Sequence, residues 1–149
     1  MKVRRYRESD WSEWLRMSRA LFTGTTDDDH TTDMAVFAAR PDAQVFIAVR
    51  PDDSVCGFVE AGTRSIADGC STSPVGYVEA WYVDPDVRRE GYGRALLEAA
   101  EQWAVDQGYR EMASDALLDN HVSHEAHKRN GYVEVDRQIT YRNPRPDRR

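Results

Sequence analysis

One continuous stretch, residues 75–107, restricts the fold of this chain more than any other. It begins with the alternating apolar run VGYVEAWYV, passes through a charged turn that contains Gly91 and Gly93, and continues into the amphipathic run RALLEAAEQWAV. Gly108 is placed to end that helix, and a strand-like run, YREMASDA, follows. A crossover of this kind is right-handed and sets the two strands parallel. The sequence therefore predicts a parallel strand–helix–strand unit over residues 74–109.

The remaining segments alternate between strand-like and helix-like patterns. Strands are expected at residues 2–6, 43–50, 54–64 and 132–142, and helices at 9–22 (with Ser9 as N-cap), 31–40 and 120–131. The run ADGCSTSP has neither period and reads as a loop. Because no repeat or linker interrupts the series, we predict one α/β domain over residues 1–149. Its mixed sheet would have about six strands flanked by four helices, and residues 143–149 would form a frayed tail.

Composition narrows the classes of partner. The 149 residues are 40% hydrophobic and 31% charged, typical of a soluble globular domain. No run approaches the ~18 apolar residues of a membrane span, and no secretory signal is apparent. A net charge of −6 argues against nucleic acid and favours cationic partners. Spacing alone leaves a disulfide between Cys56 and Cys70 open, but two free thiols in a reducing cytoplasm are favoured.

The turn between the strand and the helix has the form Arg88-x-x-Gly91-x-Gly93. It is neither the dinucleotide fingerprint GxGxxG nor a P-loop. Glycines at a helix entrance let several N–H groups point at one place, and the helix dipole adds positive charge there, which suits a pyrophosphate. The alternative is a plain turn with solvated arginines.

The order of elements, with V-D-P, then x-x-R-R-x-G-x-G, then an Asn-led helix that ends in Gly-aromatic, resembles the GCN5-related N-acetyltransferases (GNAT). The resemblance implies that acetyl-CoA is the co-substrate and that the turn holds its pyrophosphate. It implies that Asn120 contacts the pantetheine arm, although Asn120 also suits a simple N-cap. The cofactor-binding residues expected on this basis are Trp81, Tyr82, Val83, Arg88, Arg89, Glu90, Gly91, Tyr92, Gly93 and Asn120.

A narrower resemblance covers residues 56–142. DGCSTSPVGYVEAWYVDPDVRREGYG and YREMASDALLDN look like the aminoglycoside 6'-N-acetyltransferases, which often form homodimers. The resemblance implies that Phe22, Glu79, Asp115 and Asp136 bind a polycationic amino sugar, with Asp115 nearest the reacting amine as the catalytic residue. This chain has Leu21-Phe22-Thr23 where that branch usually has Leu-Trp-Pro, and Asp136 where Glu is common.

Strand geometry adds independent expectations for the acids. Glu79 alternates with Tyr77 and Trp81, so the three should share one face of their strand. Asp115 lies at the carboxyl end of a parallel strand, where open α/β sheets place their ligands. A carboxylate is a weak base towards an ammonium, so Asp115 would orient the amine and take its proton late or through water. The alternative for each acid is a surface charge or a loop cap.

The histidines do not indicate a metal site. His121, His124 and His127 share one helix without the further ligands that zinc requires. His127 stands where many acetyltransferases carry a tyrosine that protonates the departing thiolate, but helix packing is the favoured interpretation.

Taken together, these features predict a cytoplasmic enzyme that transfers acetyl groups directly to the 6'-amine of aminoglycosides and so confers resistance. The alternatives are acetylation of another small amine, such as a polyamine or an amino acid, and a non-catalytic acetyl-CoA sensor.

Overall fold

The structure is a computed structural model that describes residues 2–148. The chain divides into two compact units, Met1–Asp115 and Ala116–Arg149, which are described separately. Among the described residues, no helix is long and apolar enough to cross a membrane.

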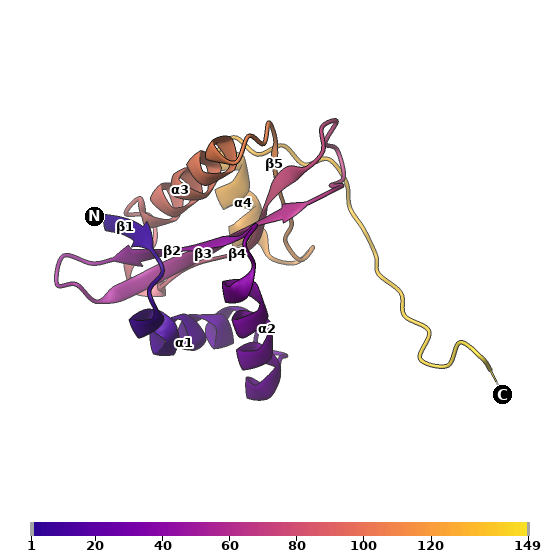
Figure 1. Cartoon of the computed structure of the whole chain (residues 1–149), viewed down its shortest axis with the longest axis horizontal. Coiled ribbons are helices and arrows are strands. Elements are labelled where there is room, and N and C mark those ends of the chain that lie inside the picture. Colours follow the sequence, from indigo (N-terminus) through magenta and orange to yellow (C-terminus); the bar gives the residue numbers. More distant parts are fainter. Residues whose placement is uncertain (1, 149) are drawn as a thin grey trace. The chain divides into compact units, whose positions relative to one another are not determined.

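The first unit is built on a mixed sheet in the order β1-β2-β3-β4-β5. Its strands are β1 (Lys2–Arg5), β2 (Gln44–Val49), β3 (Val55–Arg64), β4 (Val75–Val83) and β5 (Met112–Ser114). Neighbours from β1 to β4 are antiparallel, whereas β4 and β5 are parallel. Helices α1 (Trp11–Leu21) and α2 (Asp27–Ala39) cover one face, and α3 (Tyr92–Asp106) covers the other (Figure 1). The predicted strand–helix–strand unit, β4–α3–β5, is confirmed.

Both faces of the sheet are packed with apolar side chains. Trp14 and Met17 of α1 are fully buried against Ile47 and Phe58 of the sheet. On the other face, α3 buries Leu96 and Leu97. Full burial of such side chains stabilises a fold by roughly 1.5–3 kcal/mol each. This two-sided core holds the carboxyl ends of β4 and β5, from which the candidate site is built.

Gly76 explains how closely β4, β5 and α3 approach one another. A Cβ atom at this position would lie 2.5 Å from the Met112 sulfur and 2.9 Å from the Ala104 Cβ. Both distances are shorter than real contacts, so a larger residue would force the Met112 side chain and helix α3 to shift away from β4.

The starts of the first two helices differ from the sequence expectation. Ser9 does not cap α1, because a short 3-10 turn over Glu8–Asp10 precedes the helix. The Asp10 carboxylate is held instead by the guanidinium of Arg4 and the backbone N–H of Arg7. Helix α2 begins earlier than predicted, since the Thr26 hydroxyl accepts a hydrogen bond from the Asp29 N–H and acidic residues fill the first turn.

The second unit contains one helix, α4 (His121–Arg129). Asn120 is its N-cap, as predicted, and its Oδ1 accepts a hydrogen bond from the Ser123 N–H at 3.1 Å. The sixth strand predicted over residues 132–142 is wrong, because this segment has no regular structure. A strand needs a neighbour to satisfy its backbone groups, and alternation of side chains reveals an amphipathic pattern without supplying that neighbour. The described residues therefore form five strands rather than about six.

Candidate functional site

The turn before α3 has the backbone of an anion-binding loop. Gly91 is the N-cap of α3 with a left-handed φ of 93°, and no side chain caps the helix there. Arg89 is also left-handed, at φ 66°, and residues 88–91 are exposed. Left-handed residues within a turn gather N–H groups into a concave surface, and the dipole of α3 adds positive charge to it. This geometry fits the pyrophosphate expected from the sequence.

Side chains from β4 hold this loop in place. The Trp81 Nε1–H donates to the Gly93 carbonyl at 3.0 Å, and the Trp81 ring covers Gly93 so closely that a Cβ there would lie 3.4 Å from it. Arg88 Nε donates to the Val83 carbonyl at 2.9 Å, while Tyr92 is buried. The side chains of Tyr92 and Trp81 therefore pack on the protein side of the loop. The backbone of the turn faces solvent, where a ligand can reach it.

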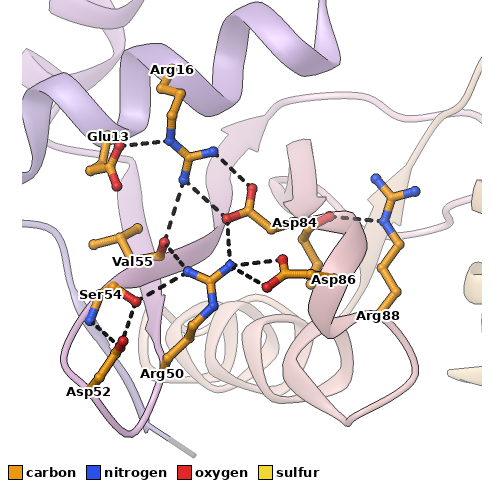
Figure 2. Close-up of polar contacts among 10 residues, drawn as sticks. Glu13, Arg16, Arg50, Asp52, Ser54, Val55, Asp84, Asp86 and Arg88 are labelled. Atoms are coloured by element: carbon orange, nitrogen blue, oxygen red, sulfur yellow. Dashed lines mark hydrogen bonds and ion pairs between the residues drawn. The ribbon is translucent and has the colours of Figure 1, made fainter.

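A charged network fixes the end of β4 just before the loop (Figure 2). Asp84 is buried, and its carboxylate accepts hydrogen bonds from Arg16 at 3.0 and 3.1 Å and from Arg50 at 3.1 Å. Arg50 also binds Asp86 in the next turn. Burial alone would raise the pKa of Asp84, but the two guanidinium groups outweigh burial and lower it. The network ties α1 and the β2–β3 turn to the start of the loop.

Along the second half of β4, one edge of the strand has no neighbouring strand within residues 2–148. Pairing of β4 with β5 ends at Val78, opposite Ser114. From residue 79 to 83, β4 pairs only with β3, and no other strand of residues 2–148 lies alongside. Such an edge offers backbone groups to an extended ligand arm. Trp81, Tyr82 and Val83, expected beside the pantetheine arm, all lie on it.

A β-bulge at Glu79 changes which side chains share a face. Glu60 pairs with Ala80 and Ala61 with Val78, so Glu79 is the extra residue on β4. Glu79 consequently faces α2 together with Tyr77, whereas Trp81 packs against Gly93 of α3. The expectation that Glu79 and Trp81 share a face is wrong, because the bulge interrupts the simple alternation.

Asp115 and Glu79 are linked through two intervening side chains. The Tyr77 hydroxyl donates to Asp115 Oδ2 at 2.5 Å. The Arg64 guanidinium lies 3.5 Å from the centre of the Tyr77 ring and binds both Glu79 oxygens, at 2.7 and 3.0 Å. Burial and the neighbouring Asp115 carboxylate raise the pKa of Tyr77, so its hydroxyl stays protonated as a donor. The structure thus brings Asp115 and Glu79 into one connected site.

A pocket of about 360 Å³ opens beside this site, within the usual size range of ligand pockets. Two of the residues expected to bind substrate, Phe22 and Glu79, lie in its wall. The other lining residues come from α2, from β3 and from the segments that flank α2: Thr25, His30, Asp33, Met34, Phe37, Arg40 and Glu60. The pocket is acidic overall, as a polycationic ligand requires.

Sequence reasoning missed Glu60, His30 and Arg64. Glu60 carried a signal, because it is a lone acid in the strand run VCGFVEAG, where it interrupts apolar residues. His30 and Arg64 carried none, since a histidine in an acidic stretch and an arginine at a strand end are common on surfaces.

Two expected site residues, Asn120 and Asp136, belong to the second unit. The Asn120 side chain caps α4, and Asp136 Oδ1 accepts a hydrogen bond from the Arg137 N–H. His127 contacts Ser123 and the Tyr132 ring within the same unit. In the first unit Cys56 is buried and its pKa is raised to about 11 by burial, so it is unsuited to act as a nucleophile. Both cysteines are free thiols.

We expect Gly91→Ala to weaken acetyl-CoA binding. A Cβ in the left-handed region costs about 1–2 kcal/mol, which the loop can relieve only by changing the direction of its N–H groups. The KM for acetyl-CoA should rise by about 5–30-fold, and the same strain should lower the thermal midpoint by about 2–8 °C. Gly108→Ala, which places the same strain at the far end of α3 (φ 87°), is the matched control. An unchanged KM for acetyl-CoA in Gly91→Ala would contradict this role of the loop.

Comparisons with known proteins agree with this geometry. Residues 8–132 match the Acetyltransferase (GNAT) family. The chain is 40% identical over 146 residues to an aminoglycoside N(6')-acetyltransferase type 1 of Klebsiella aerogenes, covering 95% of each chain. The crystal structure of an aminoglycoside 6'-N-acetyltransferase from Acinetobacter haemolyticus superposes with a TM-score of 0.89 at 31% identity, covering 96% of this chain and 98% of that one. A second structure, AAC(6')-Iy with the bisubstrate analogue CoA-S-monomethyl-acetylneamine, gives a TM-score of 0.88 at 31% identity, covering 95% of this chain and 97% of that one.

Proposed function

The chain belongs to the GNAT family of acetyltransferases, and we propose that it transfers the acetyl group of acetyl-CoA to the 6'-amino group of aminoglycosides. The resemblance inferred from the Arg88–Gly93 turn is confirmed, as are the enzyme class and acetyl-CoA as co-substrate. The observation that carries the proposal is the joint presence of a left-handed glycine turn before α3, a β4 edge without a neighbouring strand, and an acidic pocket whose Glu79 is linked to Asp115 through Arg64 and Tyr77.

The residues of the first unit fit acetyl-CoA. The backbone of the Arg88–Gly93 turn would hold its pyrophosphate, and the β4 edge from Trp81 to Val83, which has no neighbouring strand, would lie along its pantetheine arm. The thioester supplies an activated acetyl group. A backbone N–H of β4 beyond the bulge is suited to stabilise the oxyanion that forms on acyl transfer, and one such donor contributes about 2.7–4 kcal/mol in other acyl-transfer enzymes. We propose that Asn120 contacts the same arm.

The acids serve the acceptor. Asp115 would orient the 6'-amine and receive its proton late or through water, since a carboxylate is a weak base towards an ammonium. Glu79 and Asp136 would bind other ammonium groups, and the exposed Phe22 ring would stack on a sugar. Transfer would be direct, because the pKa values of both thiols are raised, that of Cys56 by burial and that of Cys70 by burial and the neighbouring Glu111 carboxylate.

Thiol release from acetyl-CoA tests the function, with kanamycin-class aminoglycosides beside spermidine and lysine as acceptors. Release that depends on a free 6'-amine is expected. If only spermidine or lysine supports release, the proposed acceptor would be wrong, whereas the assignment of the turn to acetyl-CoA would stand. Coenzyme A binding without release to any acceptor would point to a sensor and overturn the proposal.

We also propose a homodimer, in which residues 132–142 pair with a second copy. Within this segment Val133, Val135, Ile139 and Tyr141 are exposed apolar side chains at odd-numbered positions, which is the pattern of one strand face that lacks a partner. Exposed groups of this kind favour addition to a strand edge.

Ile139→Lys is expected to convert the dimer to a monomer in light scattering, because it puts a charge on the paired face. Gln138→Lys, on the other face of the segment, is the matched control and should remain dimeric. A wild-type chain that is monomeric at micromolar concentration would overturn the proposal.

Two further features belong to the same proposal. We propose that the two units act as one acetyltransferase domain, since the family match extends across their boundary from residue 8 to 132. We propose a cytoplasmic location, because free thiols suit a reducing compartment.

A further inference from the structure

Glu60 and the exposed Asp33 are the acids of this pocket that form no ion pair within residues 2–148, and Glu60 is the less exposed of the two. The Glu79 carboxylate is bound by Arg64, and the Arg40 guanidinium is bound to Asp42 and to the Thr63 carbonyl. Within residues 2–148, the Glu60 side chain has a single hydrogen bond, in which the Trp14 Nε1–H donates to Oε2 at 3.2 Å. Its second oxygen is therefore left for a ligand.

A second observation in the same pocket points to a ligand. His30 is 4% exposed and lines the pocket, and its ring lies against that of Phe22 in a tilted arrangement, with 6.5 Å between centroids. Among the described residues, no group forms a hydrogen bond with its side chain. Within residues 2–148 the sealed side-chain polar atom without a partner is the Ser18 hydroxyl, so the unpaired nitrogens of the His30 ring are accessible and can bond a ligand in the pocket.

We infer that this pocket is a second cation subsite, in which Glu60 binds an ammonium group of the acceptor other than the one that is acetylated. Asp33 of α2 and Glu79 of β4 add negative charge from the walls, and His30 is placed to bond a neighbouring hydroxyl or amine of the acceptor. The inference rests on the proposed function, because it assigns a further binding group to the same polycationic acceptor. It explains why a partly buried carboxylate is kept without a counter-charge from the protein.

The electrostatics of Glu60 support this subsite. Burial raises the pKa of Glu60 to about 7, and the negative charges of Glu79 and Asp33 add to the effect, while the Trp14 hydrogen bond opposes it. The charged groups that face Glu60 are Asp33 of α2, Arg40 directly after α2 and Glu79 of β4, with His30 as a further titratable side chain. Glu60 is consequently anionic above about pH 7 and loses its attraction for a cation as the pH falls below that value.

Glu60→Gln tests the inference by steady-state kinetics with two acceptors. Neamine carries several amines, whereas methyl 6-amino-6-deoxyglucoside carries only the one to be acetylated. At pH 8 the variant should raise the KM for neamine by about tenfold, equivalent to about 1.4 kcal/mol. The kcat, the KM for acetyl-CoA and the KM for the single-amine sugar should not change. Glu98→Gln, which removes an exposed charge from α3 on the opposite face, is the matched control and should leave all four values unchanged.

The pH dependence separates a binding role from a structural one. The ratio of the two KM values for neamine, variant over wild type, should approach one at pH 6 and reach its full value at pH 8. Because folding raises the pKa of Glu60, the cost of ionising this residue in the native state grows between pH 4.5 and about 7 and is fully present at pH 8. The variant does not carry that charge, so it should be at least as stable as wild type at pH 8. A ratio near one at pH 8, or an equal rise for both sugars, would overturn the subsite. Failure of wild type to acetylate any amino sugar would instead overturn the proposed function.

Discussion

Asp115→Asn is expected to lower kcat for a 6'-amino aminoglycoside by about 10²–10⁴-fold, the usual contribution of a positioned proton acceptor. The variant keeps the shape of the side chain and can still accept the Tyr77 hydrogen bond, which is 2.5 Å long in wild type. It removes the negative charge that we propose orients the ammonium and receives its proton. The KM for acetyl-CoA should not change, because that ligand is assigned to the turn at the other end of β4. Product formation followed by thiol release gives both values.

Two variants define how this result is interpreted. Asp106→Asn removes an exposed carboxylate of α3, which bonds only Gln102, and should retain full kcat. Tyr77→Phe removes the hydroxyl that positions Asp115 and should give a smaller loss than Asp115→Asn. If Asp115→Asn raised the acceptor KM and left kcat intact, Asp115 would be a binding group and the proton would leave by another path.

Asp84→Asn is expected to destabilise the protein by about 2–3 kcal/mol. Removing one partner of a fully buried charge pair typically costs about 3–5 kcal/mol, because the remaining charge is left unpaired. The expected loss is smaller here because the Arg16 side chain is 44% exposed and can be hydrated, although Arg50 is only 21% exposed. Urea unfolding at pH 7 measures the change. The KM for acetyl-CoA should rise as well, since Asp84 fixes the end of β4 next to the cofactor turn (Figure 2).

The loss of stability in Asp84→Asn should become smaller as the pH falls. The pKa of Asp84 is lowered in the folded state from its usual value of 3.8, so its contribution is present above that value and is lost as the pH falls through the folded-state pKa. The stability difference between wild type and Asp84→Asn should therefore shrink below about pH 4. Asp86→Asn is the control, because Asp86 is 65% exposed and binds only Arg50, so less than about 1 kcal/mol should be lost. Equal losses in the two variants would contradict the central role of Asp84.

The strand–helix–strand unit could be predicted because its signals are local. The apolar alternation of β4, the amphipathic period of α3 and the closing Gly108 all lie within a few residues of the elements that they define. Asp115 could likewise be placed at the carboxyl end of a parallel strand, where the structure has it directly after Ser114 of β5. The strand expected over residues 132–142 could not be judged in the same way. Its side chains do alternate, but a strand also needs a neighbouring strand for its backbone hydrogen bonds, and the local sequence does not show whether one is present.

In the acidic site, too, the sequence shows which residues carry charge, whereas the tertiary structure shows where those charges lie. The charge of Glu79 could be read from the sequence, but the bulge that turns it towards α2 arises from its pairing with Glu60 and Ala61 of β3. Glu60 looked like a single polar interruption of a buried strand. Only packing against Trp14, the pocket wall of α2 and the neighbouring carboxylates makes it a partly buried acid with a raised pKa.

The sequence by itself determined the α/β class, the crossover unit, the glycine turn before α3 and the family, because these depend on backbone propensities and on motifs of a few consecutive residues. The tertiary structure alone decided which charges meet. Arg16 and Arg50 reach Asp84 across 68 and 34 residues of chain, and Tyr77 reaches Asp115 across 38. Such contacts depend on strand register and helix packing, in which a shift of one residue sends a side chain to the opposite face. Local pattern therefore specified the elements of this enzyme, and packing specified the chemistry between them.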